Sequence, residues 1–286
     1  MTDRLRNSVA AAAWGDTVHL IRDHPKSVVG TAIAASLPSV GLTLLWSLRP
    51  DLGRHFLAGW IALLPTLVVA YFVTLVAIDL SAGRHDVKRP GPGSPSVTSF
   101  VRFALTRMVT AVLLSALALA FALPVLVLEI PLGPRFILDL LSGLLFALGL
   151  SFGFLLYGLA GPASLVERLT PLFALKRSRL ITAGKRRQFL ILCLMPGLIT
   201  ALLFARNIDI DGIRSFGLRE TPAGFSREQA NVPDPSSISE ALGEGAWTFV
   251  GSMNTAVWAV LLTCFFLRLK RLEASQELPT KRKKRQ

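Results

Sequence analysis

The chain has 286 residues, of which 52% are hydrophobic, a mean hydropathy of +0.53 and a net charge of +13. An ordinary soluble domain is less apolar and more charged, so the composition excludes that class and indicates a membrane protein. The basic excess lies beside apolar runs, which favours an anionic membrane leaflet over nucleic acid as its partner.

The chain begins with an amphipathic stretch. Apolar residues recur at near-helical spacing within residues 4–26 and predict an interfacial helix. It forms most of an N-terminal arm, residues 1–27, whose three acidic residues are not typical of a signal peptide. The pair His24-Pro25 is expected to break the chain before the first span.

Apolar runs long enough to cross a membrane recur six times after this arm. About 20 helical residues cross a hydrocarbon core of roughly 30 Å. The expected fold class is therefore all-α: a polytopic membrane helical bundle of six transmembrane helices within residues 28–267, plus the N-terminal interfacial helix and a basic cytoplasmic linker helix. The predicted spans are 28–48, 56–78, 108–128, 136–160, 189–205 and 247–267.

The loop charges predict the orientation. Basic residues outnumber acidic ones by five to one in 81–107, by seven to one in 161–188 and by eight to two in the tail 268–286. The loop 206–246 has four basic and seven acidic residues. Since cytoplasmic loops carry the excess of Lys and Arg, we expect a multi-pass protein of a bacterial cytoplasmic (inner) membrane, with both termini cytoplasmic and 206–246 outside.

Small residues and prolines within the spans suggest how the helices pack. Gly149 and Gly153 form a GxxxG motif, which lets helix backbones approach closely. It predicts packing within the bundle, with a dimer seam as the alternative. Prolines within four spans indicate either helices broken around a transport site or simple tolerance of proline, and we favour tolerance. These prolines are Pro38, Pro65, Pro124 and Pro196.

The sequence carries no recognisable catalytic motif. There is no P-loop, no nucleophile elbow and no His pair at metal-ligand spacing. No predicted span has a charged residue near its centre, which argues against a proton pump. We therefore expect no catalytic residue, metal or cofactor. One polar group in the outer loop is a candidate site for a lipid enzyme, although a solvated loop explains it better: Asp209, Asp211, Arg214 and Glu220.

A short internal similarity suggests a duplicated hairpin. The segment FALTR at 103–107 and the segment FALKR at 173–177 match at four of five positions, and each precedes a predicted span. This spacing would suit two copies of a helical hairpin with a basic linker, and chance similarity in a chain rich in Leu and Ala is the alternative.

The region around the second of these segments resembles a known family. The residues that carry the resemblance are Glu167, Pro171-Leu172, Ala174-Leu175-Lys176-Arg177-Ser178, Leu180, Thr182 and Gly184. They resemble the "E…GP…ALKRSW.LTKG" signature of a bacterial family that includes the membrane domain attached to some glycerophosphoryl diester phosphodiesterases. The last span resembles the family's closing "TAV…YxxLR" from Thr255 to Arg268, with Phe265 or Phe266 in place of Tyr.

The resemblance covers roughly residues 5–273 and implies a membrane domain. Thr170 stands where the signature has Gly, and Arg179 stands where it has Trp. The soluble phosphodiesterase domain of some relatives has no counterpart in these residues, so the resemblance does not imply that activity.

The basic linker is the candidate site. We expect it to lie at the inner leaflet, with Gly184 ending its helix. It either contacts lipid headgroups or an acidic partner, or only sets the topology. Glu167 is expected to pair with Arg168, Lys176 or a lipid-side cation. The candidate contact residues are Arg177, Arg179, Lys185, Arg186 and Arg187.

Three functions are consistent with this sequence. The favoured hypothesis is a non-enzymatic inner-membrane protein that organises lipid or envelope, or scaffolds a membrane partner. Its partners would be anionic lipids, a protein or a second copy of itself, and not nucleic acid. The alternatives are a transporter or permease subunit for a neutral or lipidic substrate, and a membrane-embedded lipid enzyme.

Overall fold

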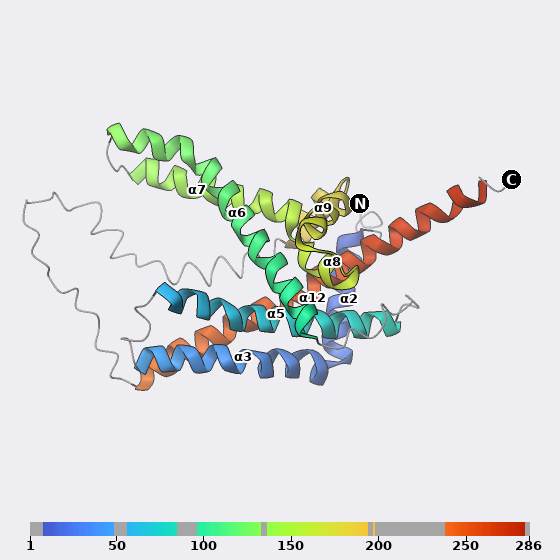
Figure 1. Ribbon diagram of the computed structural model, residues 1–286, viewed down its shortest axis with the longest axis horizontal. Helices are drawn as coiled ribbons and strands as arrows, with labels where there is room; N and C mark the ends of the chain where they lie inside the picture. The colour runs from blue at the N-terminus through green and yellow to red at the C-terminus, as the bar shows by residue number, and fades with distance from the viewer. Residues whose placement is uncertain are drawn as a thin grey trace, which may run out of the picture.

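The computed structural model describes residues 8–48, 56–84, 96–132, 136–193, 197 and 238–283, and in these residues α-helix is the dominant regular structure, with no strand. The all-α class is therefore confirmed. Figure 1 labels the helices, which are α2 (Val9–Asp23), α3 (Pro25–Leu48), α5 (Phe56–Arg84), α6 (Val97–Leu132), α7 (Phe136–Tyr157), α8 (Ala160–Val166), α9 (Pro171–Thr182) and α12 (Ile238–Lys283).

Five of the described helices are long and apolar enough to cross a membrane, which fits a multi-pass membrane protein. They overlap five of the six predicted spans. The remaining predicted span, 189–205, lies mostly outside the described residues, although residues 186–193 are helical. The six-span topology therefore stays a prediction. The membrane-length stretches are Pro25–Leu45, Leu64–Ser81, Val97–Val125, Leu141–Val166 and Gly243–Ser275.

Local side-chain chemistry explains where several helices begin and end. Ser8 accepts a hydrogen bond from the N–H of Ala11 and so caps α2. The predicted break at His24-Pro25 is confirmed, since α2 ends at Asp23 and Pro25 opens α3. Gly184 has φ +78° just after α9, a left-handed conformation that glycine adopts without strain.

Helices α6 and α12 extend furthest beyond the predicted spans. Helix α6 begins at Val97 rather than at residue 108, because Ser96 and Ser99 bond each other's backbone N–H at 3.2 and 3.3 Å in a capping-box arrangement. Arg102 and Arg107 therefore belong to a membrane-length helix. Helix α12 likewise continues beyond residue 267 to Lys283. Hydropathy identifies only the apolar part of a helix, and the helix itself can continue into the polar residues on either side.

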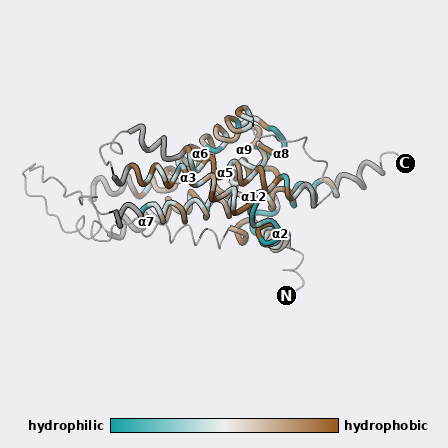
Figure 2. The backbone as a smooth tube through the Cα atoms, turned by 90° about the horizontal axis from the view of Figure 1, so that it is seen from below, coloured by the Kyte–Doolittle hydropathy of each residue, from teal (hydrophilic) through white to brown (hydrophobic). Residues whose placement is uncertain are grey.

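The helices form two groups that meet at one end. Helices α3, α5 and α12 lie side by side, while α6 and α7 form a pair that diverges from them (Figure 1). Helices α2, α8 and α9 gather where the groups meet. Hydrophilic residues concentrate on α2, around α8 and α9 and on the C-terminal part of α12 (Figure 2). The segments predicted to share the cytoplasmic side thus lie at one end of the molecule.

A column of aromatic rings joins the two groups. The ring of Phe189 stacks on Phe154 of α7, with centroids 5.8 Å apart, and on Phe265 of α12, at 5.3 Å. Trp258 meets Phe154 edge-on at 5.2 Å. Phe189 and Phe265 are fully buried, so the segment after α9 is anchored between α7 and α12.

The contact between α6 and α7 needs small residues. A Cβ on Gly149 would lie 2.6 Å from the Cα of Ala118, and a Cβ on Gly153 would lie 2.6 Å from Cδ2 of Leu114. Both glycines therefore face α6 of the same chain. Nothing lies within 4 Å of a Cβ built on Gly143 of the same helix.

We expect Gly149→Ala to lower the stability of the protein by about 1–3 kcal/mol, because the new methyl group meets backbone that cannot move aside. Gly153→Ala should cost less, since flexible leucine tips can shift. The midpoint of thermal unfolding in mild detergent measures this. Gly143→Ala is the control and should leave the midpoint unchanged or slightly raised. Equal midpoints for all three variants would contradict this packing.

Candidate functional site at the basic end of the bundle

A serine of helix α9 hydrogen-bonds the backbone at the break between helices α7 and α8. Helix α7 ends at Tyr157 and α8 begins at Ala160, which leaves polar backbone groups without helical partners. The hydroxyl of Ser178 donates to the carbonyl oxygen of Leu156 at 2.9 Å and accepts from the N–H of Leu159 at 3.2 Å. Ser178 is fully buried, so one side chain hydrogen-bonds a polar backbone group on each side of the break and holds α9 against it.

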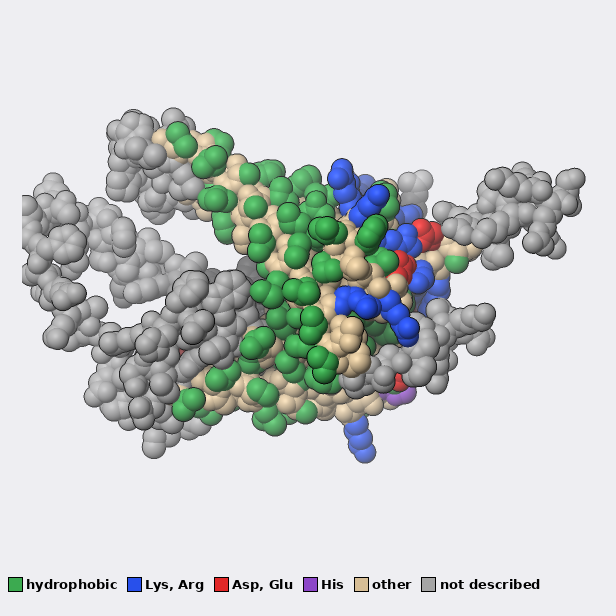
Figure 3. All heavy atoms as spheres, viewed as in Figure 1, with side chains coloured by type: hydrophobic (Ala, Val, Ile, Leu, Met, Phe, Trp, Pro, Cys, Tyr) green, Lys and Arg blue, Asp and Glu red, His purple; other side chains and the backbone are tan. Residues whose placement is uncertain are grey.

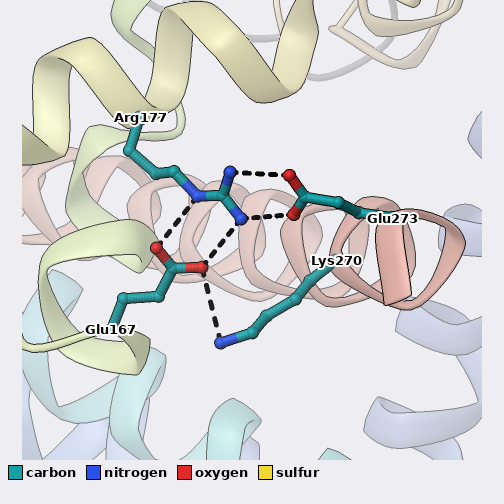
Figure 4. A network of polar contacts seen from close by, with 4 residues as sticks. All are labelled: Glu167, Arg177, Lys270 and Glu273. Carbon is teal, nitrogen blue, oxygen red and sulfur yellow. Dashed lines mark hydrogen bonds and ion pairs between the residues drawn. The ribbon is translucent and has the colours of Figure 1, made fainter. Parts of the chain in front are cut away.

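A four-residue ion-pair network holds the same helix to α8 and α12. Nε and Nη2 of Arg177 donate to the two carboxylate oxygens of Glu167 at 2.9 and 3.1 Å. Nη1 of Arg177 donates to Oε1 of Glu273 at 2.8 Å, and Nη2 donates to the other oxygen. Lys270 lies 3.4 Å from Glu167 (Figure 4). The network therefore joins three segments that are far apart in the sequence.

The two carboxylates hold Arg177 in its charged form. Hydrogen bonds to Glu273 and then to Glu167 raise the pKa of the Arg177 guanidinium above its ordinary value, although partial burial opposes the change. Glu167 pairs with Arg177 and Lys270, and neither of these residues is among the partners predicted for it, which were Arg168, Lys176 or a lipid-side cation.

A second ion pair anchors the N-terminal helix. Nε and Nη2 of Arg268 on α12 donate to the carboxylate of Asp16 on α2 at 2.5 and 2.7 Å. The side-chain oxygen of Gln188 accepts a hydrogen bond from the N–H of Val9 at 3.2 Å. Helix α2 is therefore packed on the bundle at its basic end.

The candidate basic residues fall into two groups. Arg177 is engaged by the network and points between α8 and α12 (Figure 4). The other candidates face outwards: Arg179, Arg186 and Arg187 are exposed and Lys185 is half-buried. On the face shown in Figure 3, Lys and Arg side chains collect at one end of the molecule, beside a broad hydrophobic surface. Arg177 therefore has a structural role, whereas the other four candidates form a basic surface.

Helix α9 also exposes large apolar side chains, which sequence reasoning missed. Leu172, Phe173 and Leu180 are 73%, 65% and 59% exposed. The exposed residues Lys176 and Arg179 lie on the same outer side of the helix. The available signal was the i, i+7 spacing of Phe173 and Leu180, since residues seven apart share a helix face. We call Leu172, Phe173, Lys176, Arg179 and Leu180 the α9 outer face.

The two similar pentapeptides occupy different environments. Phe103 is fully buried, whereas Phe173 is 65% exposed. Arg177 pairs with two carboxylates, whereas no residue that the structure describes forms an ion pair with Arg107. This difference gives no support to a duplicated hairpin.

In the described part of the chain no group of three or more His, Cys, Asp or Glu residues could hold a metal ion. The candidate residues Asp209, Asp211, Arg214 and Glu220 lie outside the described residues.

No family model, curated protein or solved structure matches this chain.

We expect Arg177→Gln to destabilise the protein by about 1–3 kcal/mol, because it removes the cation that Glu167 and Glu273 share and leaves only Lys270 in the network. Adding Glu273→Gln should restore part of this loss, with a coupling energy near 1 kcal/mol, since Glu273 is partly exposed. Thermal unfolding of the single and double variants measures the coupling. Arg179→Gln, from the outer side of the same helix, should have almost no effect. Additive losses would show that the pair is uncoupled.

Proposed function

We propose that this chain is a non-enzymatic integral protein of a bacterial cytoplasmic membrane that organises lipid or scaffolds a membrane partner through its basic end. The observation that carries the proposal is the α9 outer face, where exposed basic and bulky apolar side chains alternate. Amphipathic helices of this composition bind at membrane interfaces by apolar burial and by attraction to anionic lipid.

The docking of α9 supports the proposal, because Ser178 and Arg177 hold its inner side and leave the outer face pointing away from the bundle. In this arrangement Phe173 and Leu180 enter the boundary of the acyl chains. Lys176 and Arg179 lie at the level of the phosphates. The exposed pair Arg186 and Arg187 extends the basic surface, and each basic residue near an anionic surface contributes about 1 kcal/mol.

The same geometry underlies the remaining parts of the proposal. The gathering of Lys and Arg side chains at one end of the bundle supports a cytoplasmic side for the linker and for both termini. The proposed family is that of the glycerophosphoryl diester phosphodiesterase membrane domains. Three residues that carry this resemblance have structural roles here: Glu167 and Arg177 form the network, and Ser178 closes the break after α7.

The second candidate function is a transporter or permease subunit, in which the α9 outer face docks a soluble ATPase. The exposure of Leu172 and Phe173 favours it, since such side chains also fill grooves of partner proteins. Helices α3 and α5 continue through Pro38 and Pro65, so these prolines supply no broken helix for a transport site.

We expect Arg186→Gln/Arg187→Gln to weaken the retention of anionic phospholipid by the protein in mild detergent roughly thirtyfold, because two charges worth about 1 kcal/mol each are lost. Mass spectrometry of lipid per protein measures this. The matched control is Arg22→Gln/Lys26→Gln, which removes two exposed charges outside the α9 region. Equal losses in both variants would reduce the basic surface to a role in topology.

Affinity purification from native membranes separates the two candidate functions. The scaffold hypothesis predicts anionic lipid or a membrane partner without a stoichiometric ATPase. Phe173→Ser/Leu180→Ser should then weaken lipid retention. An ATPase recovered at near-equal stoichiometry, and lost in this variant, would support the permease subunit and contradict the lipid scaffold.

A further inference from the structure

Arg107 is the arginine of α6 that lies against α8, and the Nε atom of its guanidinium is buried. Its Cζ lies 5.3 Å from the centroid of the Phe103 ring, which is fully buried. Gly161 of α8 comes so close that a Cβ there would lie 2.8 Å from Nε and 3.0 Å from Cζ of Arg107. The absence of a side chain at Gly161 is thus what makes room for the guanidinium.

This cation lacks an anion. Nε of Arg107 is buried, and no residue that the structure describes offers it a hydrogen bond or a carboxylate. Arg177 and Arg268 at the same end of the bundle each bind carboxylates with two or more nitrogens. A buried N–H donor of a charged group that has no acceptor costs free energy, and an anion bound at this guanidinium would supply the acceptor.

The location of Arg107 indicates which anion. The residue lies in a membrane-length stretch, near its N-terminal and basic end, and keeps some exposure, which leaves a route from outside the bundle. Phosphate groups are the abundant anions at that boundary, and the planar guanidinium binds them with paired N–H donors. Aspartate or glutamate from a partner would have to enter the membrane interface to reach it.

We propose that Arg107, enclosed by Phe103 and Gly161, binds one phosphate group between α6 and α8. The group is carried either by a phospholipid headgroup or by a soluble phosphate compound. The site is separate from the α9 outer face. It would hold a single ligand in a defined place, whereas the α9 outer face contacts a leaflet collectively. The inference therefore does not depend on the lipid scaffold and is tested apart from it.

The test is native mass spectrometry of the full chain with phosphatidylglycerol added back after delipidation. Wild-type protein should show one phosphatidylglycerol adduct that persists at the lowest lipid concentrations. Its affinity should fall at least about tenfold in Arg107→Gln, because a charge-assisted contact is lost. Arg107→Lys should retain part of it. Gly161→Ala should weaken it, because the new methyl group displaces the guanidinium. Arg102→Gln, on the same helix, should keep the adduct.

Thermal unfolding separates a lost site from a misfolded variant. Without lipid, Arg107→Gln should unfold at or above the wild-type midpoint, since it removes an unpaired buried charge. Added phosphatidylglycerol should raise the midpoint of the wild type and not that of Arg107→Gln. Stabilisation by inorganic phosphate, abolished in Arg107→Gln, would assign the site to soluble phosphate compounds. An adduct and a lipid-induced shift that are both unchanged in Arg107→Gln would overturn the proposal.

Discussion

The basic end of this protein depends on satisfying the backbone where the chain breaks between α7 and α8. Unpaired backbone groups that are buried away from water cost several kcal/mol each, so a buried break must be closed by protein. The buried hydroxyl of Ser178 does this by bonding Leu156 on one side and Leu159 on the other. Because Ser178 belongs to α9, closing the break also fixes the position of α9.

The fixed position of α9 determines how charge is distributed. Arg177 binds the carboxylates of Glu167 and Glu273, and its charge thereby joins α8, α9 and α12. Arg179 lies two positions further along the helix and faces outwards. A structural ion pair and a candidate lipid contact thus alternate along one short helix. Arg107, whose buried Nε has no hydrogen-bond partner among the described residues, belongs to neither group.

The packing of the apolar body is equally specific. The backbone of α7 approaches α6 at Gly149, where a methyl group would meet Ala118 at 2.6 Å. The stacked rings of Phe154, Phe189 and Phe265 connect the two helix groups near the basic end. In a membrane, helix association relies on such close packing, because lipid offers apolar surroundings everywhere. The basic end is therefore built on closely packed helices.

The helical class, five membrane-length helices, the break at His24-Pro25 and the glycine turn at Gly184 followed from the sequence, because hydropathy, proline and glycine act locally. The start of α6 at Val97 did not, since the capping by Ser96 and Ser99 gives no hydropathy signal. No sequence pattern indicated which basic residues form ion pairs. Arg177 and Glu273 are 96 residues apart, and their contact exists only once α9 and α12 are packed. The close approach of Gly161 to Arg107 could not be predicted for the same reason, because burial arises only when the helices are assembled.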